Sequence, residues 1–216
     1  VAGFDLPRLL VGSLGQLAVL VEISLKVFPR PEAHGTVRLR GSITETLANI
    51  ESLARATFDI ECLDVVPGED SAELLARLAG PASVLPARLD RVRRHLGGGD
   101  VIGDDSTLWE HPRELDWVPD GWDLLHVPVT PRQIVHLEPV LRELGAVRRY
   151  SAGGQVAWVA VGRAAELEPA LTSQDLTGLH LLGRSTGRRV IGRSPDNELG
   201  RRVRAALDPF QRFAGW

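Results

Sequence analysis

"WDLLHVPVTPRQIVHLEPVLRELGAVRRYSAGGQVAWVAVG", residues 122–162, has the pattern of a strand, a helix and two further strands in direct succession. Residues 122–129 form an apolar, β-branched run that predicts a strand. Thr130 can cap the following helix, Pro131 suits its first turn, and Gly145 suits its end. Two short strands, 146–150 and 155–161, follow around a glycine turn. The stretch therefore predicts a β-α-β-β unit.

The same pattern occurs earlier in the chain. The segment "TVRLRG", 36–41, alternates apolar and basic residues and predicts a half-buried strand. Ser42 and Glu45 can form a capping box at the start of a helix whose apolar residues recur at helical spacing. Residues 58–66 predict the next strand. Residues 72–79 suit either a strand or a helix, and we predict a strand because the preceding strand would otherwise lack a partner. Residues 81–99 predict a second helix.

Two such units side by side predict an α+β fold, in which one ferredoxin-like antiparallel sheet has helices on one face. A polar linker, 100–120, connects the units. The tryptophans in and after it are expected to anchor the linker to the sheet; they are Trp109, Trp117, Trp122 and Trp158. Beyond residue 163 we expect a helix near 164–171, a short strand at 179–183 and a helix over 195–207.

Composition excludes several classes of protein. The 216 residues carry a formal charge of -3, with a pI near 6.1, which disfavours nucleic acid as a partner. Cys62 is the single cysteine, which excludes a disulfide framework and a cysteine-rich iron-sulfur site built by this chain alone. Its alternation with charged neighbours indicates a small buried strand residue, although a nucleophile is the alternative. No run of about 18 uninterrupted apolar residues predicts a transmembrane segment.

The six histidines lie far apart, without the spacing of a metal site, so we predict no metal ligands. They are His34, His95, His111, His126, His136 and His180.

Residues 1–31 combine a glycine turn, Gly12 to Gly15, with an apolar run, 17–28, that predicts a buried strand ending at Pro29. The turn is not a Walker loop, because no Lys-Ser or Lys-Thr follows it. It is not a Rossmann fingerprint either, because it precedes a strand. Two interpretations remain open. The turn can simply lead into a core strand, or its backbone N–H groups can hold a phosphate or a ring edge.

The whole opening resembles the end of the FAD-binding domain in the vanillyl-alcohol oxidase and p-cresol methylhydroxylase (PCMH) superfamily. Two positions depart from the pattern: Gln16 stands where Thr is usual and Ala18 where Gly is usual. Ala18 tests the match, because Ala resists a positive φ. The matching positions are Gly3, Asp5, Leu6, Leu9, Gly12, Ser13, Gly15, Leu17, Val19, Leu20, Glu22, Leu25, Lys26 and Pro29.

The remainder looks most like the C-terminal part of the FAD-binding E subunits of bacterial glycolate oxidase. The "DSTLWEHPRELDW" linker, the "AGGQVAWVAV" hairpin and the final Asp208, Pro209 and Phe213 carry this resemblance, whereas 214–216 depart from the family's Asn-Pro-Gly. It implies three parts: 1–31, the end of a PCMH-type FAD-binding domain; 32–162, a cap; and 163–216, a segment packing back on the FAD domain. The main pyrophosphate loop is expected upstream of residue 1.

The resemblance also implies a function, namely oxidation of a 2-hydroxy acid such as glycolate to the 2-oxo acid, with hydride transfer to FAD. The implied FAD contacts are Gly12, Ser13, Leu14, Gly15 and Val19. No catalytic residue is assigned. The implied partners are a second flavin subunit and an iron-sulfur subunit, in the cytoplasm or at the periphery of the inner membrane through those partners.

A group of arginines near the C-terminus permits two interpretations: a solvated face, or contact with an acidic partner or the substrate carboxylate. They are Arg184, Arg188, Arg189, Arg193, Arg201, Arg202 and Arg204.

Two other functions remain open from the sequence. One is a self-sufficient FAD oxidase of another alcohol. The other is a ferredoxin-like module for binding or dimerisation without enzymatic activity.

Overall fold

The computed structural model describes residues 5–13, 15–183, 189–193 and 198–213. It divides into two compact units, residues 30–193 and residues 1–29 with 194–216. Residues 163–193, which we expected in the C-terminal segment, fall within the larger unit. The functional division into an FAD-domain end, a cap and a returning segment stays a prediction.

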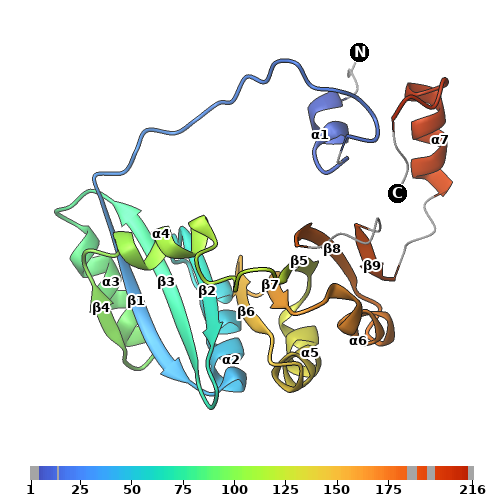
Figure 1. Ribbon diagram of the computed structural model, residues 1–216. Coiled ribbons are helices and arrows are strands. Elements are labelled where there is room, and N and C mark those ends of the chain that lie inside the picture. The colour runs from blue at the N-terminus through green and yellow to red at the C-terminus, as the bar shows by residue number, and fades with distance from the viewer. Residues whose placement is uncertain (1–4, 14, 184–188, 194–197, 214–216) are drawn as a thin grey trace. The chain divides into compact units, whose positions relative to one another are not determined.

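The larger unit contains a nine-stranded antiparallel sheet in the order β4-β1-β3-β2-β6-β7-β5-β8-β9 (Figure 1). The strands are β1 (Ala33–Gly41), β2 (Cys62–Pro67), β3 (Ala72–Gly80), β4 (Asp100–Ile102), β5 (Asp123–Pro128), β6 (Val147–Ser151), β7 (Val156–Val161), β8 (Thr177–Leu182) and β9 (Val190–Gly192). Its helices are α2 (Ile43–Arg55), α3 (Leu85–His95), α4 (Ser106–Glu114), α5 (Pro131–Glu143) and α6 (Glu168–Ser173), with a 3₁₀ turn at Ala164–Glu166.

This sheet consists of two ferredoxin-like halves. The first half runs β1-α2-β2-β3-α3-β4 with the strand order β4-β1-β3-β2, and the second runs β5-α5-β6-β7-α6-β8 with the equivalent order reversed. The second strands of the two halves, β2 and β6, pair antiparallel at Val65 and Tyr150 and so join the halves. The two predicted β-α-β-β units are confirmed. The helix predicted over 81–99 is α3, and the helix and strand predicted near 164–171 and 179–183 overlap α6 and β8, whereas β4 was not predicted.

One face of the sheet carries the hydrophobic core. Alternate strand residues such as Val37, Val65 and Val159 pack there against α2, α3, α5 and α6 in one continuous cluster. The strand residues between them point to the opposite face. The prediction that the helices lie on one face is wrong for α4, which lies on the opposite face and bonds to Thr36 there (Figure 1).

Local sequence signals account for the two central helices. Both predicted N-caps are confirmed. Ser42 and Glu45 form a capping box at α2, and Thr130 and Gln133 form one at α5. The β6-β7 turn is tight, with positive φ angles at Ala152, Gly153 and Gly154. Residues 72–79, which suited two structures, form β3 because β1 and β2 both pair with them.

The smaller unit contains α1 (Leu6–Leu10) and α7 (Glu198–Leu207). Asp208, which follows α7, accepts hydrogen bonds from the backbone N–H groups of Arg212 and Phe213, at 2.8 and 2.9 Å. This carboxylate closes the chain into a turn. Asp208 of the segment Asp208-Pro209-x-x-x-Phe213 therefore has a direct structural role in this chain.

The prediction of a buried strand at 17–28 is wrong for the residues described. The segment is extended but pairs with no described strand, and its apolar side chains are exposed, with Val21 at 95% and Phe28 at 88%. A strand needs a hydrogen-bonded neighbour and a covered face, and among the described residues neither is present. The apolar composition of residues 17–28 is therefore not sufficient to form a strand.

Glu138, Arg148 and Tyr150 form a buried cluster next to the joint, the paired strands β2 and β6, and this cluster should be required for stability. Burial raises the pKa of the Tyr150 hydroxyl, which donates to Glu138, and Glu138 also accepts from Arg148 Nε at 3.0 Å. Tyr150→Phe removes one donor from a buried carboxylate, so the free energy of unfolding in urea should fall by about 1–3 kcal/mol. The control Thr172→Ala removes an exposed hydroxyl and should change it by less than about 0.5 kcal/mol. Equal values for the two variants would contradict a stabilising role of this cluster.

Candidate functional site

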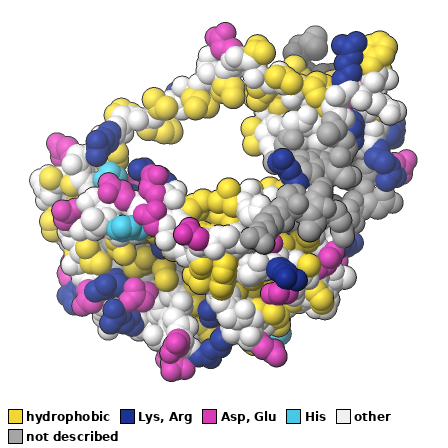
Figure 2. Space-filling model, in the orientation of Figure 1, with side chains coloured by type: hydrophobic (Ala, Val, Ile, Leu, Met, Phe, Trp, Pro, Cys, Tyr) yellow, Lys and Arg dark blue, Asp and Glu magenta, His cyan; other side chains and the backbone are white. Residues whose placement is uncertain are grey.

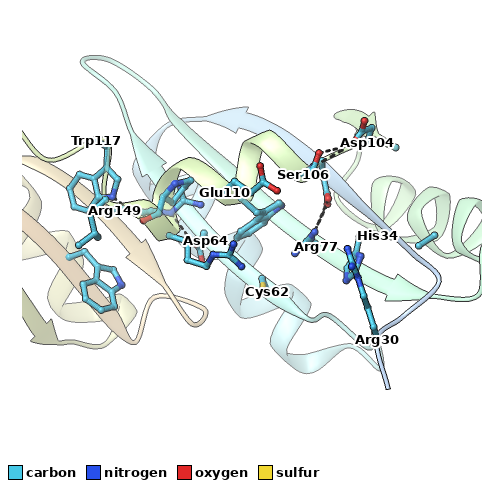
Figure 3. A pocket seen from close by; sticks show the side chains of 18 of the residues that line it. Arg30, His34, Cys62, Asp64, Arg77, Asp104, Ser106, Glu110, Trp117 and Arg149 are labelled. Atoms are coloured by element: carbon cyan, nitrogen blue, oxygen red, sulfur yellow. Dashed lines mark hydrogen bonds and ion pairs between the residues drawn. The ribbon is translucent and has the colours of Figure 1, made fainter. Parts of the chain in front are cut away.

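A hollow of about 1010 Å³ lies on the sheet face that carries α4 (Figure 3). All of its lining residues belong to the larger unit. Strands β2, β3 and β6 form its floor through Cys62, Asp64, Arg77 and Arg149, and α4 forms one wall. The hollow therefore lies across the joint between the two ferredoxin-like halves.

Asp105 fixes the start of α4 to the sheet. Its side chain is almost fully buried and accepts two hydrogen bonds from Arg77, at 2.9 and 3.0 Å, and one from Thr36, at 2.7 Å. Thr36 and Arg77 are direct cross-strand neighbours on β1 and β3. A buried carboxylate needs such charge-assisted bonds to offset the loss of its hydration. The network thus gives the floor of the hollow a fixed geometry.

Trp109 of α4 lies beside two guanidinium groups. Its indole N–H donates to Thr36 Oγ1 at 2.9 Å, while the guanidinium carbons of Arg77 and Arg149 lie 5.6 and 5.5 Å from the centre of its ring. Both distances suit a cation–π interaction. The prediction that the tryptophans anchor the linker is confirmed for Trp109.

Arg149 bridges the two halves. Its Nε donates to Asp64 of β2 at 2.7 Å, and both side chains are about nine-tenths buried. Burial raises the pKa of the Asp64 carboxyl group against the lowering effect of Arg149. The Nη2 atom of Arg149 is buried and has no hydrogen-bond partner among the described residues. Burying a guanidinium nitrogen without a hydrogen-bond acceptor costs free energy. The pair with Asp64 does not compensate this cost for Nη2.

Charges of both signs line the hollow. Its arginines are Arg30, Arg77, Arg113 and Arg149, and its acids are Glu32, Asp64, Asp104, Asp105 and Glu110. Figure 2 shows basic and acidic side chains interspersed on the face that carries α4. The hollow therefore has no surplus of positive charge, and discrimination between ligands must come from individual groups.

Cys62 lies at the floor of the hollow, half-buried on β2. Burial, together with the nearby carboxylates of Glu61 and Asp64, raises the pKa of its thiol. A nucleophilic cysteine needs a lowered pKa. The structure thus favours the interpretation of Cys62 as a strand residue.

The predicted FAD contacts belong to the smaller unit, whereas the residues that line this hollow belong to the larger unit. Gly12 and Gly15 have φ angles of 80° and 79°, in the region that favours glycine, whereas Ala18 is not among the described residues with positive φ. The N–H of Ser13 donates within the turn to Leu10. Val19 is 70% exposed, and Leu14 lies outside the described residues. The FAD-binding role of these positions stays a prediction.

Three further predictions concern metal ligands, membrane-spanning segments and the C-terminal arginines. Within the described ranges, no group of three or more His, Cys, Asp and Glu side chains can hold a metal ion. No helix in the part of the chain described combines the length and apolar character of a membrane span. In the C-terminal arginine group, Arg193 pairs with Asp175, and Arg184 and Arg188 lie outside the described residues.

Comparison with known proteins gives two partial matches. The chain is 39% identical over 114 residues to "Glycolate oxidase subunit GlcE" of Escherichia coli (strain K12), a match spanning 53% of this chain and 29% of that protein. It is 36% identical over 67 residues to "Glycolate oxidase subunit GlcD" of Bacillus subtilis (strain 168), spanning 31% of this chain and 13% of that protein. This chain is similar to parts of glycolate oxidase subunits. The predicted resemblance is confirmed to that extent, and no protein-family model matches.

Asp105 should hold α4 on the sheet of this glycolate-oxidase-like chain. Asp105→Asn leaves Arg77 facing an amide instead of a carboxylate, so the free energy of unfolding should fall by about 3 kcal/mol. The matched control is Asp100→Asn, which breaks an exposed pair with Arg38 and should cost less than about 1 kcal/mol. Denaturation curves measure both. A loss for Asp105→Asn no greater than that of the control would contradict the anchoring role.

Cys62 should react slowly with iodoacetamide near neutral pH. Because its thiol pKa is raised, the alkylation rate should rise with a midpoint above about pH 8.5, the value of a free cysteine. Mass spectrometry of samples quenched across a pH series measures this midpoint. In urea the same cysteine should return to the ordinary midpoint, and a folded-state midpoint below that of the unfolded chain would show an activated thiol instead.

Proposed function

We propose that this chain is part of an FAD-linked oxidoreductase subunit of the glycolate oxidase type, which oxidises a 2-hydroxy acid to a 2-oxo acid. The partial similarity to two glycolate oxidase subunits supports the reaction class. The observation that carries the proposal is the hollow at the joint, because its lining is polar and aromatic and its floor is fixed by buried hydrogen bonds. Such a preorganised concave surface is typical of a small-molecule site.

The residues of the smaller unit are compatible with FAD. A Cβ placed on Gly12 or Gly15 would meet no atom within 4 Å, so the backbone there is open to an approaching group. The positive φ at both positions is the geometry that lets glycine bring backbone close to a ligand. When bound, FAD would supply the acceptor for the hydride that leaves C2 of the hydroxy acid, while the hydroxyl group loses its proton. We propose Gly12, Ser13, Leu14, Gly15 and Val19 as the contacts.

This chain's own residues would bind and orient the substrate. The Arg77–Asp105–Thr36 network keeps the floor rigid, and α4 shields part of it from water. A fixed floor holds a small acid in one orientation, which is the main contribution that a protein makes to a hydride transfer. The further proposal is that a second flavin subunit and an iron-sulfur subunit complete the complex, in the cytoplasm or at the membrane periphery.

A second candidate function is a binding or dimerisation module without enzymatic activity. Its support is the fold itself, since two ferredoxin-like halves joined edge to edge make a common binding scaffold. The two candidates differ in one measurable property, because the module predicts no affinity for flavin.

The test is the visible absorption spectrum of the full-length protein, purified with whatever copurifies, before and after anaerobic addition of glycolate. We expect flavin bands that bleach on addition, because the hydroxy acid reduces the flavin. Bands that bleach only with another alcohol would favour the self-sufficient oxidase. A colourless protein would contradict the proposal and favour the binding module.

A further inference from the structure

One polar group of the hollow is incompletely bonded. Arg77 uses both its Nε and Nη2 atoms on Asp105, whereas Arg149 uses only Nε on Asp64 and leaves the buried Nη2 without a partner. A structural role for Arg149, which is to join the halves through Asp64, is complete without Nη2. The unbonded nitrogen therefore points to an acceptor that enters the site.

Helix α4, the wall of the hollow beside Arg149, is attached to the floor mainly by polar and aromatic contacts. Helix α4 buries none of its residues, lacks a side-chain N-cap bond, and contains Pro112. Its attachments to the floor include the Asp105 carboxylate, the Trp109 indole N–H and the two cation–π contacts. Arg149 itself lines the hollow of about 1010 Å³, so a small molecule in the hollow lies next to this side chain.

The charges of the hollow limit what this molecule can be. Arginines and acids are balanced along the lining, so a polyanion would meet carboxylates as well as guanidinium groups. A single carboxylate needs only one guanidinium group. Its two oxygens can accept two parallel hydrogen bonds from one edge of the guanidinium plane. The flat Trp109 ring beside Arg149 suits a small planar group in the same space.

We propose that Arg149 binds the carboxylate of a small organic acid beneath α4, beside Trp109. The identification of this acid with the 2-hydroxy acid substrate rests on the proposed function. The site itself rests on the unbonded Nη2 atom, the hollow that Arg149 lines and the Trp109 ring beside it. Arg149 is then a binding residue that determines specificity for acids over neutral alcohols.

Calorimetric titration of the full-length protein with oxalate tests the site without turnover. We expect binding of oxalate, and a dissociation constant raised at least about tenfold in Arg149→Lys, which keeps the charge near Asp64 but loses the planar two-donor edge. Arg149→Gln should lose binding further. Inorganic phosphate, tested in parallel, should bind more weakly than oxalate. The control Arg142→Gln changes an exposed arginine paired with Asp70 and should leave the dissociation constant unchanged.

Circular dichroism checks that each variant is folded. If Arg149→Gln is unfolded, the test rests on Arg149→Lys alone. Oxalate that does not bind to the wild-type protein, or binds equally to folded Arg149→Lys, would overturn the site. Phosphate that binds more tightly than oxalate would overturn the carboxylate assignment.

Flavin reduction separates this inference from the proposed function. Arg149→Lys should raise KM for glycolate by a similar factor, with a smaller change in kcat. If glycolate reduces the flavin of both proteins with equal KM, the site is wrong and the function stands. If Arg149-dependent oxalate binding occurs without any reduction by glycolate, the function is wrong and the site stands.

Discussion

The pairing of β2 with β6 is the constraint on which the candidate site depends. Val65 and Tyr150 are partners across this joint, and their side chains enter the core on the helix-bearing face. The residues beside them, Asp64 and Arg149, must then point to the other face, because strand side chains alternate. This register brings together a carboxylate and a guanidinium group that are 85 residues apart in the chain. Without the joint, each ferredoxin-like half would present only part of the hollow.

The two faces of the sheet have different chemistry, and the difference has a physical cause. The helix-bearing face is a continuous apolar cluster, so it supplies most of the hydrophobic stabilisation. The other face carries charged and aromatic side chains that are buried under a short helix with no buried residues of its own. Burying charges under so little apolar cover stabilises a fold poorly unless every group is paired. The unbonded Nη2 atom of Arg149 shows that this pairing is incomplete among the described residues, which is the reason for proposing a ligand on this face.

Much of the fold could be predicted from the sequence, because its signals are local. Capping boxes determine where α2 and α5 begin, and the need of β2 for a partner predicts β3 correctly. The three-residue strand β4 has no alternating pattern of its own and depends on β1. The apolar run 17–28 was predicted as a strand, yet no described neighbour pairs with it. The sequence did not predict the candidate site in the hollow, for a related reason. Thr36, Arg77, Asp105 and Arg149 share no spacing in the sequence, and only sheet register brings them together. One available signal was the basic residues at alternating strand positions, as in "TVRLRG".

The matches span less than a third of the length of either curated relative. The central claim therefore concerns the hollow itself and the proposed contact between Arg149 and a small acid. The most direct measurement is an experimental structure of the full-length protein with FAD and oxalate bound. The account predicts oxalate in the hollow beneath α4, with a carboxylate oxygen within hydrogen-bond distance of Arg149 Nη2. Oxalate bound elsewhere in the protein, without contact to Arg149, would contradict it.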